Sequence, residues 1–296
     1  MIKVTFLGTS GSTPTKERGM PSVAITYNGD VYLFDCGEGT QMKMLSYGIN
    51  ISKVNAIFLT HAHGDHIIGI AGLIRTMAML QRKKDLVIYI PKGYEKEIMS
   101  LIVFDRAMIG YKITVKGIGG GLVHKGDGFT VGAFKVSHQI STYGYVFKED
   151  DKLRFMKEKA QKLGIRGEKF SELQRKKRIK IDGRTITLRS VTNLVQGKKI
   201  VYATDTRPSS ATVAAAKGAD LLVHESNYAD KEKKLALQRK HSTAAEAAQI
   251  AKSAKVKQLV LIHLSARHRD VGPLLSDARK IFKNTTVAND GENISI

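Results

Sequence analysis

The 296-residue chain has little cysteine, a shortage of acidic residues and no long apolar run. Its single cysteine, Cys36, excludes an intramolecular disulfide and a cysteine-rich zinc knuckle, and it suits a reducing, cytoplasmic setting. No apolar stretch approaches the ~20 residues that span a bilayer, so we expect no membrane segment. The first residues, Ile2–Leu7, have a strand pattern and not the charged-then-apolar order of a leader peptide.

The shortage of acids leaves a strong positive charge. Lysine and arginine number 48 against 27 aspartates and glutamates, which gives a formal net charge of +21. Such an excess favours a polyanionic partner such as nucleic acid, although a generally basic proteome is an alternative explanation. The apolar content of 42% is ordinary for a globular protein, and we expect 1–296 to form a single domain with a sizeable core.

The most informative segment is Thr60–His66, which reads Thr-His-Ala-His-Gly-Asp-His. It follows a strand-like run, Val54–Leu59, and precedes a helix-like run, Ile67–Gln81. A turn between them can aim several short side chains at one point. Imidazole and carboxylate groups are common zinc ligands, and a merely solvated, histidine-rich turn is a poor explanation of so many ligands at a strand end. The segment therefore predicts a metal site.

Further ligand candidates end other apolar runs, namely His138, Asp205 and His263. Any one alone would more often be a hydrogen-bonded structural residue, but all three stand where loops gather into sites, at the carboxyl ends of strands. Many short strands with interspersed helices predict two sheets flanked by helices. The expected strands are 2–7, 22–27, 31–35, 54–59, 86–90, 129–137, 199–203, 221–224 and 259–263, and the expected helices are 67–81, 209–217, 243–253 and 273–281.

The segment from 148 to about 190 has a different composition, with 15 lysines and arginines against seven acids from 148 to 189. Leucine, methionine and alanine recur at helical spacing over Leu153–Leu163, which predicts a charged helix with a thin apolar stripe. Asp182-Gly183 predicts a hairpin over 179–186. Too polar for a large core, the segment is expected to project from the domain. A charge run is usually only a solvated face, but its concentration here favours a substrate-binding arm, Lys152–Arg189.

Taken together, these motifs resemble those of the metallo-β-lactamase superfamily, and within it the chain is similar to the ribonuclease Z family over nearly its full length. The matching segments are 6–11, Pro14-Thr15-Lys16-Glu17-Arg18, 34–41, 60–66, His138, Ala203-Thr204-Asp205-Thr206, 222–225, His241-Ser242-Thr243 and 263–267. The resemblance implies an α/β fold, a four-layer αβ/βα sandwich with an inserted basic arm at 148–190. It also implies a zinc-dependent endoribonuclease that removes the 3′ trailer from precursor tRNA, leaving a 3′-hydroxyl on the tRNA and a 5′-phosphate on the trailer.

The resemblance also implies roles for individual residues. Two zinc ions per subunit would be held by His61, His63 and His138, by Asp65, His66 and His263, and by a bridging Asp205. Asp65 would also accept a proton from water, and His241, oriented by Glu225, would give one to the leaving 3′ oxygen. We expect Ser242 to cap the following helix. The histidines expected to stay outside the site are His124, His224 and His268.

Contacts with RNA are expected from Lys16, Arg18 and Arg267, with Ser265 assisting through hydrogen bonds. The family further implies a homodimer in which one subunit's arm grips the tRNA bound at the other's site. The arm has no proline where many members carry a Gly-Pro element, since Gly164–Glu168 reads Gly-Ile-Arg-Gly-Glu. Two other hypotheses remain open: a small-molecule phosphodiesterase or esterase without need of a basic arm, and a catalytically silent RNA-binding protein.

Overall fold

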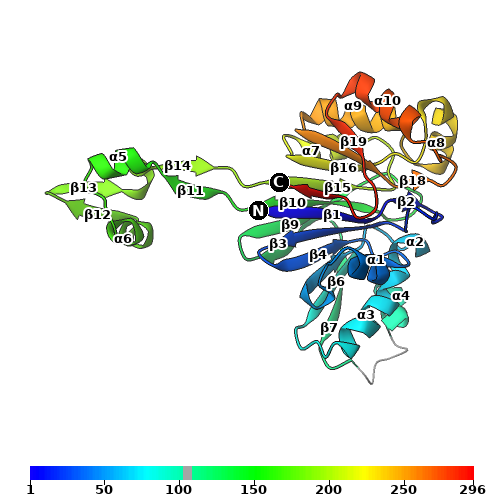
Figure 1. Ribbon diagram of the computed structural model, residues 1–296, viewed down its shortest axis with the longest axis horizontal. Helices are drawn as coiled ribbons and strands as arrows, with labels where there is room; N and C mark the ends of the chain where they lie inside the picture. The colour runs from blue at the N-terminus through cyan, green and yellow to red at the C-terminus, as the bar shows by residue number, and fades with distance from the viewer. Residues whose placement is uncertain (103–108) are drawn as a thin grey trace. The chain divides into compact units, whose positions relative to one another are not determined.

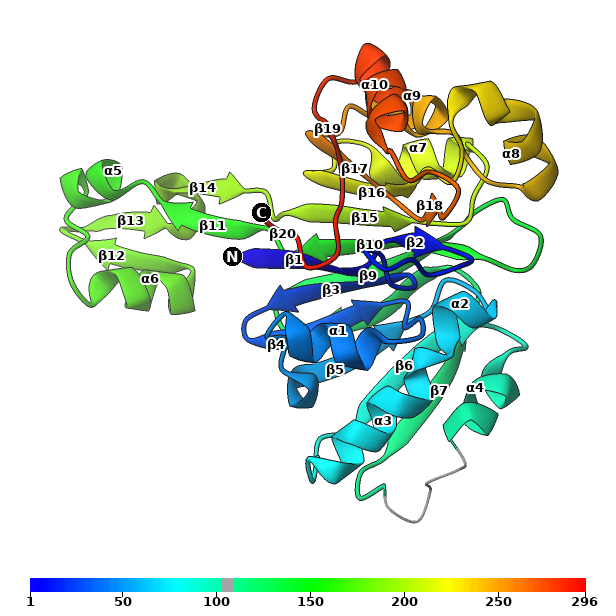
Figure 2. The ribbon, with the colours of Figure 1, turned by 45° about the vertical axis from the view of Figure 1, so that its right-hand side comes forward.

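A computed structural model describes residues 1–102 and 109–296. Its chain forms two compact units, one of Met1–Phe147 with Lys199–Ile296 and the other of Lys148–Lys198. In the larger unit, two β-sheets face each other and carry helices on their outer faces (Figure 1; Figure 2). The predicted four-layer α/β sandwich is thereby confirmed. No helix among the described residues is long and apolar enough to cross a membrane.

The first sheet has antiparallel strands at one end and parallel strands at the other. Its order is β20 (Asn293–Ser295), β1 (Ile2–Gly8), β3 (Ser22–Tyr27), β4 (Asp30–Phe34), β5 (Val54–Phe58), β6 (Leu86–Pro91) and β7 (Ile113–Ile118). The strands expected at 22–27 and 31–35 pair as a hairpin. Its turn residues Asn28 and Gly29 have φ angles of 50° and 83°, which suit a type I′ turn.

The second sheet is parallel through its C-terminal strands. Its order is β19 (Thr285–Val287), β17 (Gln258–Ile262), β16 (Leu221–Glu225), β15 (Lys199–Ala203), β10 (Tyr143–Glu149), β9 (Phe129–Lys135) and β8 (Gly121–Gly126). The helices of this unit are α1 (Thr40–Ser46), α2 (Gly64–Ile67), α3 (Gly69–Met79), α4 (Glu95–Ile102), α7 (Ser210–Ala216), α8 (Lys233–Arg239), α9 (Ala244–Ala254) and α10 (Gly272–Ile281), with short 3-10 turns at Ile51–Lys53 and Asp230–Glu232.

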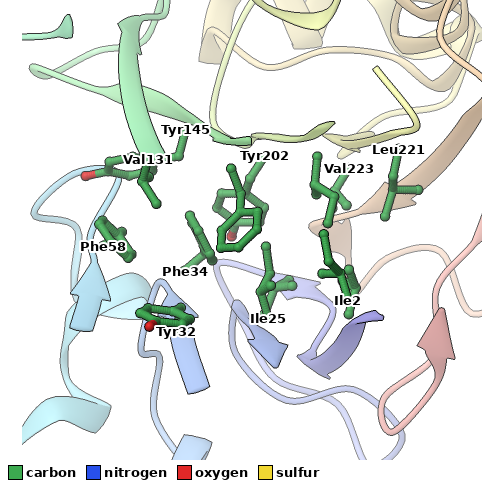
Figure 3. Close-up of a cluster of buried hydrophobic side chains, with 14 of the residues drawn as sticks. Ile2, Ile25, Tyr32, Phe34, Phe58, Val131, Tyr145, Tyr202, Leu221 and Val223 are labelled. Atoms are coloured by element: carbon green, nitrogen blue, oxygen red, sulfur yellow. The ribbon is translucent and has the colours of Figure 1, made fainter. Parts of the chain in front are cut away.

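Aromatic side chains fill the space between the two sheets. Figure 3 shows Phe34 and Phe58 of the first sheet facing Tyr145 and Tyr202 of the second. The ring centroids of Phe58 and Tyr145 lie 5.5 Å apart, an edge-on contact that adds to the free energy of burial. Separate apolar clusters hold α1, α3 and α4 against the first sheet and α7, α9 and α10 against the second. These layers fix the strand ends from which the site loops leave.

The helix predicted over 67–81 begins earlier, at Gly64, and is interrupted at Ile68, so that α2 and α3 are separate elements. The amide of Gly69 donates to the carbonyl of Cys36 at 3.0 Å and so leaves the helical ladder. A Cβ at Gly69 would lie 1.9 Å from the carbonyl oxygen of Gly37, so only glycine permits this approach. The loop after β4 is thereby joined to the histidine-rich turn.

The smaller unit, Lys148–Lys198, has a small apolar core of its own. Its elements are β11 (Lys152–Phe155), α5 (Lys157–Lys162), α6 (Lys169–Lys176), β12 (Arg178–Ile181), β13 (Arg184–Thr187), a 3-10 turn at Leu188–Val191 and β14 (Thr192–Val195). The predicted hairpin at Asp182-Gly183 is confirmed. The predicted helix from Leu153 is wrong at its start. Leu153 pairs with Leu194 in a two-stranded sheet, and this distant partner outweighs the helical spacing.

Candidate metal centre

The ligand candidates leave the carboxyl ends of strands in both sheets. His61 follows β5, His138 follows β9, Asp205 follows β15 and His263 follows β17. Asp205 and His263 turn sharply there, with φ angles of 50° and 55°. Left-handed backbone is uncommon outside glycine and tends to occur at functional sites. The parallel strands β15, β16 and β17 end at one edge, which brings these side chains together.

The structure brings all seven predicted metal ligands into two groups whose ligand atoms lie within 4.8 Å of one another in each group. The groups are His61, His63, His138 and Asp205, and then Asp65, His66 and His263. A further set of the same kind is formed by Asp205, His241 and His263. This set takes Asp205 from the first group and His263 from the second, so the two groups adjoin. The family resemblance implied this grouping, but spacing along the chain could not show it, because the ligands are up to about two hundred residues apart.

The Asp205 carboxylate stands between the two groups. Its Oδ1 atom lies 3.8 Å from Nε2 of His61 and 3.7 Å from Nε2 of His138. Its Oδ2 atom lies 3.2 Å from Nε2 of both His66 and His263. One carboxylate oxygen therefore faces each group, which is the arrangement that a shared ligand requires.

Ring nitrogens without partners show that metal ions fit this centre. The Nε2 atoms of His66, His138 and His263 are buried and have no hydrogen-bond partner. Nδ1 of His66 donates to the Asp35 carboxylate at 2.9 Å, and Nδ1 of His138 to the Lys240 carbonyl at 3.2 Å. Because these partners only accept, the Nδ1 atoms carry the protons and the Nε2 lone pairs stay free. Free lone pairs beside carboxylates form a suitable donor set for zinc.

Asp35 supports the centre although the sequence analysis did not select it. Its carboxylate is fully buried and accepts from the Thr60 amide at 2.8 Å, the Tyr202 hydroxyl at 2.9 Å and His66. The Thr60 hydroxyl also donates to it at 3.0 Å, and these four donors offset the cost of burying its charge. The sequence feature that points to Asp35 is its position at the end of a strand, directly after Phe34. An aspartate at a strand end could equally be a metal ligand, and its contact with His66 distinguishes the two roles.

Asp65 is held by the loop that follows β1. The amide of Ser12 donates to its Oδ2 atom at 3.1 Å. A Cβ at the preceding Gly11 would lie 2.6 Å from Nδ2 of Asn227, so the loop passes tightly over the centre. Burial alone would raise the pKa of the Asp65 carboxyl, but the neighbouring imidazoles of His263 and His66 hold that pKa well below its usual range. The carboxylate is therefore ionised at neutral pH.

His241 and Glu225 form a buried pair beside Asp205. Nδ1 of His241 lies 3.0 Å from Oε1 of Glu225, whose side chain is fully buried. The carboxylate also accepts from the backbone amides of Thr206 and Ser242, at 2.5 and 3.0 Å. Burial alone would lower the pKa of His241, but the charge of Glu225 raises it to about 9. The imidazole is thus set to be protonated at neutral pH.

Ser242 does not cap helix α9 as predicted. The cap is Thr243, whose hydroxyl accepts from the Glu246 amide at 3.2 Å while the Glu246 carboxylate accepts from the Thr243 amide at 3.0 Å. This is a capping box. The Ser242 hydroxyl turns inward instead and donates to the Thr206 carbonyl. Two adjacent hydroxyl residues fit a cap equally well in sequence, and the contacts with Glu225 and Thr206 decide between them.

A cavity of about 420 Å³ opens over the centre. Arg267 lines it and is held there by a hydrogen bond from its Nε atom to Ser265 at 2.9 Å and by stacking 5.0 Å from the Tyr228 ring centroid. Arg239 also lines the cavity. Arg239 was missed, and no sequence signal separates it from the many other basic residues.

Lys16 and Arg18 line a second cavity, of about 890 Å³, but in different ways. Lys16 is exposed. The Arg18 guanidinium turns inward and donates to the Thr9 hydroxyl at 2.6 Å, the Ala288 carbonyl at 2.5 Å and the Asn289 side chain at 3.0 Å. Arg18 therefore fastens the loop, and Lys16 remains the residue placed to meet a phosphate.

The histidines expected outside the site have other partners. His124 Nδ1 lies 3.0 Å from the Tyr89 hydroxyl, and His224 Nδ1 lies 2.8 Å from the Glu225 carbonyl. His268 pairs with Glu232 at 3.0 Å. None of these histidines joins the ligand groups found among residues 1–102 and 109–296.

Comparison with known proteins agrees with this geometry. Residues 2–103 match the family model described as anti-Pycsar protein Apyc1, and residues 171–264 match that of the beta-lactamase superfamily domain. Human tRNase Z, short form, superposes with a TM-score of 0.71 at 25% identity and 99% coverage of both chains. YhfI from Bacillus subtilis, a metallo-beta-lactamase fold protein, gives 0.71 at 19% identity, with coverage of 99% and 98%. The fold and the His/Asp centre thus define a protein of the metallo-β-lactamase class.

Sequence relatives narrow this class. Ribonuclease Z of Archaeoglobus fulgidus is 40% identical over 100% of this chain and 98% of its own. Ribonuclease Z of Methanothermobacter thermautotrophicus is 40% identical over 98% of this chain and 95% of its own. The chain belongs to the ribonuclease Z family.

Proposed function

We propose that this protein is an endoribonuclease that removes the 3′ trailer from precursor tRNA, leaving a 3′-hydroxyl on the tRNA and a 5′-phosphate on the trailer. The observation that carries the proposal is the buried Glu225–His241 pair beside the two ligand groups. A hydrolytic centre alone would suit many substrates. A paired acid suits a poor leaving group such as a ribose 3′ oxygen, which needs a proton as it departs.

We propose that the centre holds two zinc ions per subunit. One ion would be bound by His61, His63 and His138, the other by Asp65, His66 and His263, and Asp205 would contact both. Bound zinc would polarise the scissile phosphate and lower the pKa of a water molecule. Three buried Nε2 atoms without hydrogen-bond partners support this assignment.

The chain's own residues supply the proton transfers. Asp65, whose carboxylate belongs to the second ligand group, accepts the proton of the attacking water as the new bond from oxygen to phosphorus forms. The bond from phosphorus to the 3′ oxygen breaks, and His241 gives that oxygen its proton. Glu225 keeps His241 protonated and fixes its ring, because its carboxylate lies 3.0 Å from Nδ1. Both residues are returned to their first state by exchange with solvent.

Recognition of RNA is assigned to basic residues. Arg267 is oriented toward the cavity by Tyr228, and Lys16 is exposed on the neighbouring loop. The arm, Lys152–Arg189, would bind the body of the tRNA, and in a homodimer the arm of one subunit would serve the site of the other. A cytoplasmic enzyme without a membrane partner fits this substrate.

One experiment tests the proposal directly. Purified protein is incubated with a 5′-end-labelled precursor tRNA, with and without a chelator, and the cut is mapped. We expect one cut at the 3′ end of the tRNA, lost with the chelator and restored by zinc, and lost in Asp65→Ala with an unchanged circular dichroism spectrum. Full cleavage in the chelator, or by Asp65→Ala, would refute the proposed chemistry.

A further inference from the structure

Arg207 lies behind the centre and binds the segment that carries His241. One of its guanidinium nitrogens donates to the His241 carbonyl at 2.5 Å and to the Glu246 carboxylate at 2.7 Å. The other donates to the second Glu246 oxygen at 2.5 Å. The Arg207 side chain is only 17% exposed. Among the described residues, those that line the cavity do not include Arg207, so the guanidinium faces the protein and not the substrate.

The main chain of Arg207 is fixed as firmly as its side chain. Its amide donates to the Ser137 carbonyl at 2.9 Å, and the Ser137 amide donates to the Thr206 hydroxyl at 3.3 Å. Ser137 precedes His138, and Arg207 follows Asp205 by two positions. The residue thus joins two metal-ligand segments through its backbone and the His241 segment through its side chain.

Hydrogen bonds hold His241 at its amide, its ring and its carbonyl, and the ring also packs 5.1 Å from that of His138 and 5.5 Å from that of His263. Its amide donates to the Ala236 carbonyl at 2.9 Å, its ring binds Glu225, and its carbonyl accepts from Arg207. The planar guanidinium grips a carboxylate with two nitrogens and still reaches the carbonyl. A lysine has one ammonium nitrogen, so it cannot bind both Glu246 oxygens and the His241 carbonyl in this planar arrangement. Without Arg207, the His241 carbonyl loses its charged donor, and this peptide is held only from its other side, where the Ser242 amide donates to Glu225 at 3.0 Å.

We propose that Arg207 is a positioning residue for proton donation, fixing the His241 main chain against the Asp205 segment so that the ring meets the leaving oxygen. The inference rests on the proposed function. A displacement of about 1 Å at a reacting group can cost about a hundredfold in rate. The loss should therefore appear in the protonation of the leaving group and not in binding of RNA or metal.

The test compares two leaving groups on one RNA. The first substrate is a precursor tRNA, and the second has sulfur in place of the 3′ oxygen at the cut, because a thiolate leaves with little need of a proton. In Arg207→Lys we expect single-turnover cleavage of the oxygen substrate to fall about 10- to 100-fold. Cleavage of the sulfur substrate, the Kd for precursor tRNA and the zinc content should each stay within about threefold.

Arg82→Lys is the matched control. Arg82 is 4% exposed and donates to the carbonyls of Lys84, Ser52 and Asp85. Like Arg207, it ties backbone segments together, but it has no contact with the centre. The control variant is expected to lower the melting temperature and to leave the ratio of oxygen to sulfur cleavage unchanged.

Several outcomes would overturn the inference. The first is an equal fall in the cleavage rates of both substrates in Arg207→Lys. The second is the same change in the oxygen-to-sulfur rate ratio in Arg82→Lys. The third is weaker binding of RNA by Arg207→Lys with an unchanged rate ratio. In a His241→Ala background, Arg207→Lys should add no further loss on the oxygen substrate, and an additive loss would also contradict it. Should Arg207→Lys fail to fold, the test passes to Glu246→Gln. This variant must lower the ratio of oxygen-substrate to sulfur-substrate cleavage, as predicted for Arg207→Lys. A wild-type protein that does not cut precursor tRNA refutes the proposed function instead.

Discussion

Removal of the arm is the sharpest test of what chooses the substrate. Leu153 and Leu194 are opposite residues in an antiparallel pair, and Lys152 and Val195 form the next pair. An Asn-Gly turn between Leu153 and Leu194 can therefore close the chain as a two-residue hairpin, replacing residues 154–193. The buried cluster of the smaller unit lies wholly within the removed segment, and the three other clusters have no member there. The larger unit should fold without it.

The magnitude follows from charge. The removed residues include thirteen lysines and arginines and four acids. If about four of these cations contact phosphates, the slope of log Kd against log salt concentration should decrease by about 3 to 4. The affinity for precursor tRNA at physiological salt should then fall about a hundredfold. The metal centre is untouched, so the rate on a small substrate should not change.

The assay follows two substrates at several salt concentrations. We expect the deletion to weaken precursor tRNA cleavage severely while sparing hydrolysis of a small chromogenic phosphodiester. A full-length variant with the basic run 175–178 changed to glutamine should show part of the same loss. Equal survival of both activities would refute the arm interpretation and favour a small-molecule phosphodiesterase.

Three further predictions concern single residues. Asp65→Ala should abolish RNA cleavage without unfolding the protein, and cleavage by the wild type together with this loss excludes a catalytically silent RNA-binding protein. Lys16→Ala should weaken RNA binding with little change in unfolding free energy. Arg18→Ala should lower the unfolding free energy by about 1–3 kcal/mol, because two acceptors on buried residues, the Thr9 hydroxyl and the Ala288 carbonyl, lose their donor. Urea titration separates the two variants, and equal stabilities would contradict the inward role of Arg18. Burial raises the pKa of Cys36 to about 12, so a disulfide reagent at about pH 8 should label the thiol only after denaturation, and rapid labelling of native protein would contradict its burial.

Local patterns explain why much of the fold could be predicted. Alternation of apolar residues and the Asn28-Gly29 turn reflect backbone preferences that act over a few residues, and these survive folding unchanged. Ligand side chains at the ends of apolar runs were visible for the same reason. Leu153 shows the limit of this reasoning, because its strand partner, Leu194, lies about forty residues away and leaves no trace in the local spacing.

The amino-acid pattern alone predicts the type of chemistry, through imidazoles and carboxylates at strand ends, a basic inserted segment and the resemblance to a known family. The folded chain shows directly which of these groups meet. It placed Asp205 between the ligand groups, put Asp35 behind His66, turned Arg18 inward and set Arg207 against His241. The physical reason is that hydrogen bonds depend on distances of about 3 Å between residues remote in the chain, and local sequence patterns carry no such distance.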